Sequence, residues 1–230
     1  SCTTSLAAGT HAIVASYAGD ADNLGSDSGV LPQLVQPAPA ATFADVPVTH
    51  WAFGSVEAVA WNGISTGCAA NPRRFCPDAV LTRAEMATFL ERAMRGPAFA
   101  YGPAGTLFAD VPLTHWAAGP IEQLHADGVT AGCGAAPLRF CPDRPITRAE
   151  IAILLLKAKY GAGYAPGTAT GNVFADVPKA SWAAAWIERF SQLGFTSGCS
   201  AGVYCPDAHV GRAEMAVFLM RVFALAGPPT

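Results

Sequence analysis

The sequence has little charge and no excess of positive charge. Only 13% of its 230 residues are charged, and 14 Lys and Arg face 17 Asp and Glu, for a net charge of −3. Binding to nucleic acid or to anionic lipid normally leaves a basic excess, so we expect no nucleic-acid partner. Long apolar runs are also lacking: residues 215–226 are interrupted by Arg221, and a membrane span needs about 20 apolar residues. We therefore expect no membrane insertion.

Recognisable catalytic motifs are lacking as well. There is no phosphate-binding glycine loop and no matched acid–base pair in the sequence. The five histidines are scattered and form no metal-ligand pattern. We therefore expect no enzyme, no cofactor and no metal site. The chain opens on Ser1 without an initiator Met, which we interpret as the mature or clipped product of a longer protein.

Six of the seven cysteines form a regular pattern. The pairs are Cys68/Cys76, Cys133/Cys141 and Cys199/Cys205. The first members recur after 65 and 66 residues and the second members after 65 and 64. Such a period is typical of a tandem array.

Other motifs recur at the same period and define three repeats. In order they are Phe-Ala-Asp-Val-Pro, Trp-Ala, Gly-Cys, Cys-Pro-Asp and Arg-Ala-Glu. The predicted repeats cover residues 43–95, 108–160 and 174–225, separated by linkers at 96–107 and 161–173 that are rich in Gly, Ala, Pro and Thr.

Each repeat is predicted to be a helix, a loop and a second helix. The first helix should begin near a cap at Thr49, Thr114 or Ala180/Ser181 and end before Gly63, Gly128 or Gly194. The second helix has a capping box, Thr82-x-x-Glu85 and Thr147-x-x-Glu150, whereas the third repeat has Gly211 as the cap.

The second helices carry matching apolar stripes. These are Met86, Phe89/Leu90, Ala93; Ile151, Leu154/Leu155, Ala158; and Met215, Phe218/Leu219, Val222. Three such helices predict a central three-helix bundle. A repeat of about 50 residues buries too little surface to fold alone, so the three should form one body. The expected fold class is mainly α.

Together these motifs resemble the S-layer homology (SLH) module, in three copies over about residues 43–225. The resemblance implies a pseudo-threefold trefoil with grooves between adjacent repeats. In many members these grooves hold a pyruvylated cell-wall polysaccharide and anchor the protein to a bacterial surface. It therefore implies a non-catalytic protein located outside the cell, at the cell surface or in an S-layer, whose partner is an anionic wall polysaccharide. Other copies of the chain or another surface protein are further expected partners.

The candidate glycan-binding residues are Arg83, Arg148, Arg212, Trp51, Trp116, Trp182, Gly67 and Gly132. The arginines stand at helix N-termini, where the backbone already favours an anion, and a guanidinium binds a carboxylate through paired hydrogen bonds. The tryptophans would add flat apolar surface.

Structural interpretations of these residues remain open. The arginines could be ordinary solvated charges and the tryptophans core residues. The Glu of each Arg-Ala-Glu is best interpreted as a cap. The recurring Asp45, Asp110 and Asp176 could order a turn or face a ligand.

The cysteine pairs depart from the SLH pattern. Disulfides are the simplest explanation, since seven residues intervene in the first two pairs and five in the third, and they indicate a location outside the cytoplasm. Zinc is the alternative, but each pair supplies two of about four ligands.

Residues 1–35 lie outside the repeats and are followed by a linker at 36–42. Residues 10–17 alternate like a strand, and the segment resembles the last strands of a bacterial immunoglobulin-like repeat. Cys2 is the odd cysteine, and we expect its partner elsewhere. Two interpretations follow. In the first, this segment is the end of a domain of a larger surface protein, cut by a proteolytic or cloning boundary. In the second, its strands complete a sheet in a neighbouring subunit and so build a fibre or lattice.

Overall fold

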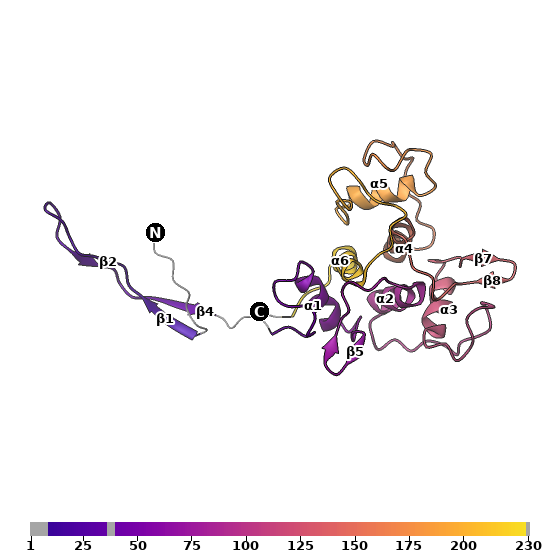
Figure 1. Ribbon diagram of the computed structural model, residues 1–230, viewed down its shortest axis with the longest axis horizontal. Helices are drawn as coiled ribbons and strands as arrows, with labels where there is room; N and C mark the ends of the chain where they lie inside the picture. Colours follow the sequence, from indigo (N-terminus) through magenta and orange to yellow (C-terminus); the bar gives the residue numbers. More distant parts are fainter. Residues whose placement is uncertain (1–8, 36–39, 229–230) are drawn as a thin grey trace. The chain divides into compact units, whose positions relative to one another are not determined.

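The computed structural model describes residues 9–35 and 40–228. The chain divides into two compact units, one before residue 41 and one spanning Ala41–Pro228 (Figure 1). Within the described ranges, no helix has the length and apolar character that a membrane crossing requires.

The first unit is a small β structure. β1 (Gly9–Ile13) pairs antiparallel with β4 (Leu31–Val35), and β2 (Ser16–Tyr17) pairs with β3 (Ser26–Asp27). The strand predicted over residues 10–17 is thus present in two pieces. Its immunoglobulin-like origin stays a prediction, and Cys2 lies outside the described residues.

In the second unit each repeat contributes two helices. The first helices are α1 (Phe53–Trp61), α3 (Ala118–Ala126) and α5 (Ala184–Gln192). The second helices are α2 (Arg83–Arg95), α4 (Arg148–Tyr160) and α6 (Arg212–Phe223). Short hairpins lie between them in the first two repeats: β5 (Ala69–Ala70) with β6 (Arg73–Arg74), and β7 (Gly134–Ala135) with β8 (Leu138–Arg139).

The prediction of a mainly α trefoil is wrong. The described residues form a mixed α/β structure of six helices and small antiparallel two-stranded sheets. The loops between the helices pair with themselves, and isolated bridges join one repeat to another, as between Thr82 and Pro145. Two-residue strands and single bridges leave no period-2 pattern in the sequence, so the helical stripes dominated the prediction.

The first helices begin later than predicted, while the second helices begin as predicted. Ala52, Ala117 and Ala183 occupy the caps of the first helices, in place of the predicted Thr49, Thr114 and Ala180/Ser181. Both capping boxes are confirmed: Thr82 and Thr147 accept from the N–H of the glutamate three residues on, and that glutamate accepts from the cap.

The core joins all three repeats. α2, α4 and α6 each contact the other two, and the pairs α1·α6, α2·α3 and α4·α5 link neighbouring repeats. The predicted stripes supply buried residues such as Leu90, Leu155 and Leu219. The ends of this unit meet, since Asn62 after α1 donates to the Ala226 carbonyl (2.8 Å), and Glu57 of α1 accepts from the Thr42 N–H (2.8 Å).

The three predicted disulfides are present, each with 6.0 Å between its Cα atoms.

An aspartate of the same repeat fixes each disulfide loop. Asp45 accepts from the N–H groups of Phe75 and Cys76 (both 2.8 Å), and Asp110 and Asp176 do the same in their repeats. These aspartates therefore order the loop, as the structural interpretation held. Asp45 and Asp110 lie beside their cysteine pairs, but those sulfurs are bonded to each other and are not thiolate ligands.

Reducing these disulfides should destabilise the second unit without changing its helices. Each short loop contributes about 2 to 3 kcal/mol by the chain-entropy estimate. We expect a Cys133→Ser/Cys141→Ser variant to lose about that much in urea unfolding. A loss below about 0.5 kcal/mol would mean that the hydrogen bonds of Asp110 to the loop are enough to fix it without the disulfide.

Candidate functional site

The three candidate arginines are buried where the repeats meet. Each is 3–4% exposed, and each Nε donates to a backbone carbonyl in the next repeat. The acceptors are Phe140 for Arg83 (2.8 Å), Tyr204 for Arg148 (2.7 Å) and Phe75 for Arg212 (2.9 Å). The same carbonyl residue places its ring against the guanidinium carbon, at 4.8 to 5.1 Å.

Each arginine also pairs with the capping-position glutamate of the repeat that it contacts. Arg83 reaches Glu150 (3.5 Å), Arg148 pairs with Glu214, and Arg212 pairs with Glu85 (2.5 Å). Burial lowers the pKa of Arg83 and Arg148, although an arginine stays charged. The guanidinium groups thus hold the repeats together, and they are neither solvated charges nor surface-presented cations as the sequence suggested.

The candidate tryptophans lie on the surface. Trp51, Trp116 and Trp182 are 69%, 64% and 67% exposed, so the alternative that they are core residues is wrong. Two of them stack on the preceding histidine ring, at 5.7 Å between centroids for His50–Trp51 and for His115–Trp116. The His50 Nδ1 accepts from the Ala52 N–H (3.1 Å), which fixes the ring beside the start of α1.

Within residues 40–228, these candidate residues line three grooves, one at each junction between repeats. Each contains a Ser/Thr-x-Gly loop and one second helix from a single repeat, a tryptophan from the following repeat and a buried arginine from the preceding one. Groove A combines Gly67 and α2 with Trp116 and Arg212; groove B combines Gly132 and α4 with Trp182 and Arg83; groove C combines Gly198 and α6 with Trp51 and Arg148. All eight candidate residues therefore lie along the grooves.

The candidate glycines shape the groove wall. Gly67 has a φ of +98°, and a Cβ there would lie 2.2 Å from the Arg74 carbonyl oxygen. Gly132 has a φ of +88° and a similar clash with the Arg139 carbonyl. Only glycine fits where the loop passes so close to the hairpin.

Sequence reasoning missed a cation in each groove. Arg92, Lys157 and Arg221 occupy the same place in the last turns of α2, α4 and α6. None forms an ion pair within the described residues. Arg92 and Arg221 each donate to a carbonyl of their own repeat, at Ile64 (3.1 Å) and Phe195 (3.3 Å). These three residues are spaced 65 and 64 residues apart, which matches the period of the repeats. This spacing could have identified them from the sequence.

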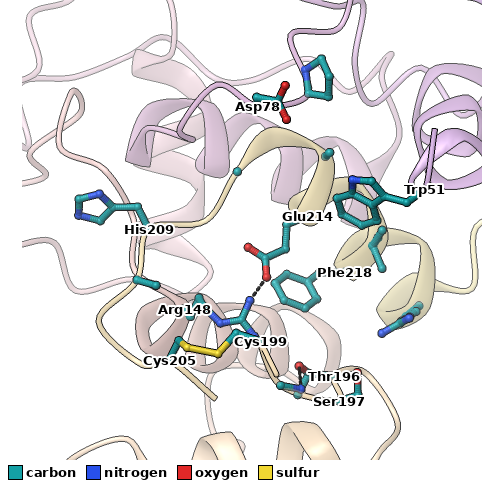
Figure 2. Close-up of a pocket in the computed structure, with 17 residues that line it drawn as sticks. Trp51, Asp78, Arg148, Thr196, Ser197, Cys199, Cys205, His209, Glu214 and Phe218 are labelled. Atoms are coloured by element: carbon teal, nitrogen blue, oxygen red, sulfur yellow. Dashed lines mark hydrogen bonds and ion pairs between the residues drawn. A yellow bond between two sulfur atoms is a disulfide. The ribbon is translucent and has the colours of Figure 1, made fainter. Parts of the chain in front are cut away.

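Groove C differs from the other two in size. Its volume is about 600 Å³, against about 230 Å³ for groove A and about 280 Å³ for groove B. Figure 2 shows the Arg148–Glu214 pair at its centre, with Trp51 on one side and His209 on the other. The Cys199–Cys205 disulfide lies beside Arg148 in the same view.

Known proteins share this repeat. Residues 107–152 match the family model of the S-layer homology domain. The chain is 32% identical over 155 residues to cell surface glycoprotein 1 of Acetivibrio thermocellus, 30% over 190 residues to an S-layer protein of Bacillus thuringiensis subsp. finitimus, and 28% over 149 residues to a cellulosome-anchoring protein of Acetivibrio thermocellus. These alignments cover 64%, 82% and 64% of this chain, but only 6%, 22% and 33% of the relatives.

Proposed function

From its S-layer homology region, we propose that this chain anchors a larger protein to a bacterial cell surface by binding an anionic cell-wall polysaccharide in its grooves. The observation that carries the proposal is that an exposed tryptophan and a cation line each groove together. Trp116 shares groove A with Arg92, Trp182 shares groove B with Lys157, and Trp51 shares groove C with Arg221.

This pairing suits an acidic sugar. An exposed indole ring offers a flat apolar face on which the C–H side of a sugar ring can lie. The cation in the same groove can bind a carboxylate through charge-assisted hydrogen bonds, and a pyruvate ketal places such a carboxylate on an otherwise neutral sugar. The buried arginines act indirectly, by fixing the repeats whose junctions form the grooves.

The proposed role of this region is binding, not catalysis. The anchoring and S-layer names of its relatives support a location at the cell surface. They describe those proteins, of which this chain matches a part, so the activity of the whole protein depends on what else it carries.

Removing the three groove cations together should weaken wall binding. A charge-assisted hydrogen bond contributes about 1.5 to 3 kcal/mol, so the Arg92→Gln/Lys157→Gln/Arg221→Gln variant should bind at least about tenfold more weakly. Co-sedimentation with purified wall material, before and after chemical removal of its acidic polymer, measures this. Arg74→Gln, at an exposed site outside the grooves, is the matched control. Equal binding by the triple variant and the wild type would reject the grooves as the site of wall binding.

A second candidate function is assembly through the first unit. Its strands expose apolar side chains, including Ile13 (41%), Val30 (65%) and Leu31 (61%), and an unpaired strand edge can accept a strand from another chain. Size-exclusion chromatography with and without residues 1–40 tests this. Concentration-dependent oligomers that disappear on truncation would favour it, and a monomer at all concentrations would exclude it.

A further inference from the structure

Groove C differs from the other two at the cap of its second helix. Thr82 and Thr147 begin α2 and α4, and each closes a capping box. Gly211 begins α6, and a glycine has no side chain with which to do so. Gly211 also lines groove C, so the missing side chain leaves space at the wall of the groove.

The backbone does not require glycine at this position. Gly211 has a φ of −81° and a ψ of 159°, close to the −82° and 161° of Thr82. A Cβ there would meet the Pro77 and Ala79 carbonyl oxygens at 3.6 and 4.0 Å, which is ordinary contact. A threonine would therefore fit, and its absence is not explained by the fold.

The glycine also changes the polar groups that face groove C. In α2 and α4 the N–H of the cap donates to the capping glutamate (3.0 Å in both). Within the described part of the chain, no such bond joins the Gly211 N–H to Glu214, although Glu214 pairs with a buried arginine as Glu85 and Glu150 do. The Gly211 N–H thus lacks the carboxylate acceptor of the other two caps, and Gly211 lines the same groove as Arg221 and Trp51.

We propose that groove C is the principal glycan site of this chain, and that Gly211 makes it so by leaving room and an N–H donor for the sugar. This inference rests on the proposed function and states which groove performs it. The volume of groove C, about 600 Å³, lies within the range of ligand sites, about 300 to 1,000 Å³. The volumes of grooves A and B fall just below that range. One acidic sugar residue with its neighbour in the polymer occupies groove C, with its ring on Trp51 and its carboxylate at Arg221.

Isothermal titration calorimetry with a pyruvate-ketal methyl hexoside, and with the unsubstituted methyl hexoside as control, tests the inference. We expect one binding site per chain for the ketal. Gly211→Thr should weaken binding at least about tenfold while the melting temperature stays the same or rises, because threonine is a good cap. Trp51→Ala should weaken binding at least about tenfold, as removal of a central tryptophan commonly does, and more than Trp116→Ala or Trp182→Ala does. Trp61→Ala, at an exposed tryptophan outside the three grooves, is the control and should change binding less than threefold.

The outcomes separate the inference from the function on which it rests. If Trp116→Ala or Trp182→Ala abolishes binding while Gly211→Thr and Trp51→Ala bind like wild type, another groove is the site; the inference fails and the anchoring function stands. If wild type binds neither the ketal nor purified wall polymer, both fail. Three equal sites per chain would also overturn the inference.

Discussion

Replacing Glu91 with leucine should make the protein more stable at pH 8 by up to about 3 kcal/mol. Glu91 of α2 is fully buried, and its Oε1 has no hydrogen-bond partner within the described residues. Burial, followed by the nearby Asp127, raises the pKa of this carboxyl to about 7 from an ordinary 4.5, despite the opposing effect of Arg95. Leu156 occupies the same position in the second repeat and is equally buried.

The sign follows from the two pKa values. Because the folded protein holds the Glu91 proton more tightly than the unfolded chain, the contribution of Glu91 to stability is highest below pH 4.5 and falls as the pH rises through about 7. A difference of about 2.5 pKa units corresponds to about 3 kcal/mol. Glu91→Leu and Glu91→Gln should both remove this fall, because neither replacement side chain ionises.

Urea unfolding at pH 5 and pH 8 measures the effect. Asp143→Asn, at an exposed carboxylate in the second repeat, is the control and should leave the pH dependence unchanged. If Glu91→Leu retained the wild-type loss of stability between the two pH values, Glu91 would be ionised without penalty in the folded protein.

Replacing Arg148 with methionine should destabilise the second unit by about 3 to 5 kcal/mol. The side chain donates to the Tyr204 carbonyl and pairs with Glu214 across the junction of two repeats. Removing one partner of a buried pair leaves the other charge uncompensated, which is the origin of so large an effect. Urea unfolding at pH 7 measures it.

A double variant distinguishes pairing from packing. Arg148→Met/Glu214→Gln should recover part of the loss, because the unpaired carboxylate is then gone. A single variant within 1 kcal/mol of wild type would show that the pair is dispensable. The same prediction bears on function: loss of wall binding in an Arg148 variant reports a loosened junction, so Trp51 and Arg221 are the better positions for testing ligand contact.

The predictions that succeeded were local in the sequence. The capping boxes at Thr82 and Thr147, the glycine stops and the three disulfides each depend on residues a few positions apart, and each is present. Their agreement across three repeats made the pattern reliable.

The predictions that failed depended on contacts between repeats. Nothing near Arg83 in the sequence indicates that Glu150 and the Phe140 carbonyl will cover it, so a helix-start arginine was interpreted as a surface cation. Bridges such as Val80 with Gly211 likewise join segments far apart in the chain, and the fold class was predicted without them. Trp51 was ambiguous for the same reason, since an apolar ring is buried or exposed according to what the next repeat brings.

The contact between α1 and α6 has a mechanical consequence if the proposed anchoring function places the chain under tension. Force transmitted along the chain enters this unit at residue 41, and the first contacts that it loads are the Glu57–Thr42 hydrogen bonds and the Asn62–Ala226 bond. Beyond them, α1 is held against α6 at the other end of the unit, next to groove C. A polymer bound to both Trp51 of the first repeat and α6 of the third would join the two parts that such a force separates. Polymer binding would therefore oppose the detachment of the first repeat from the third.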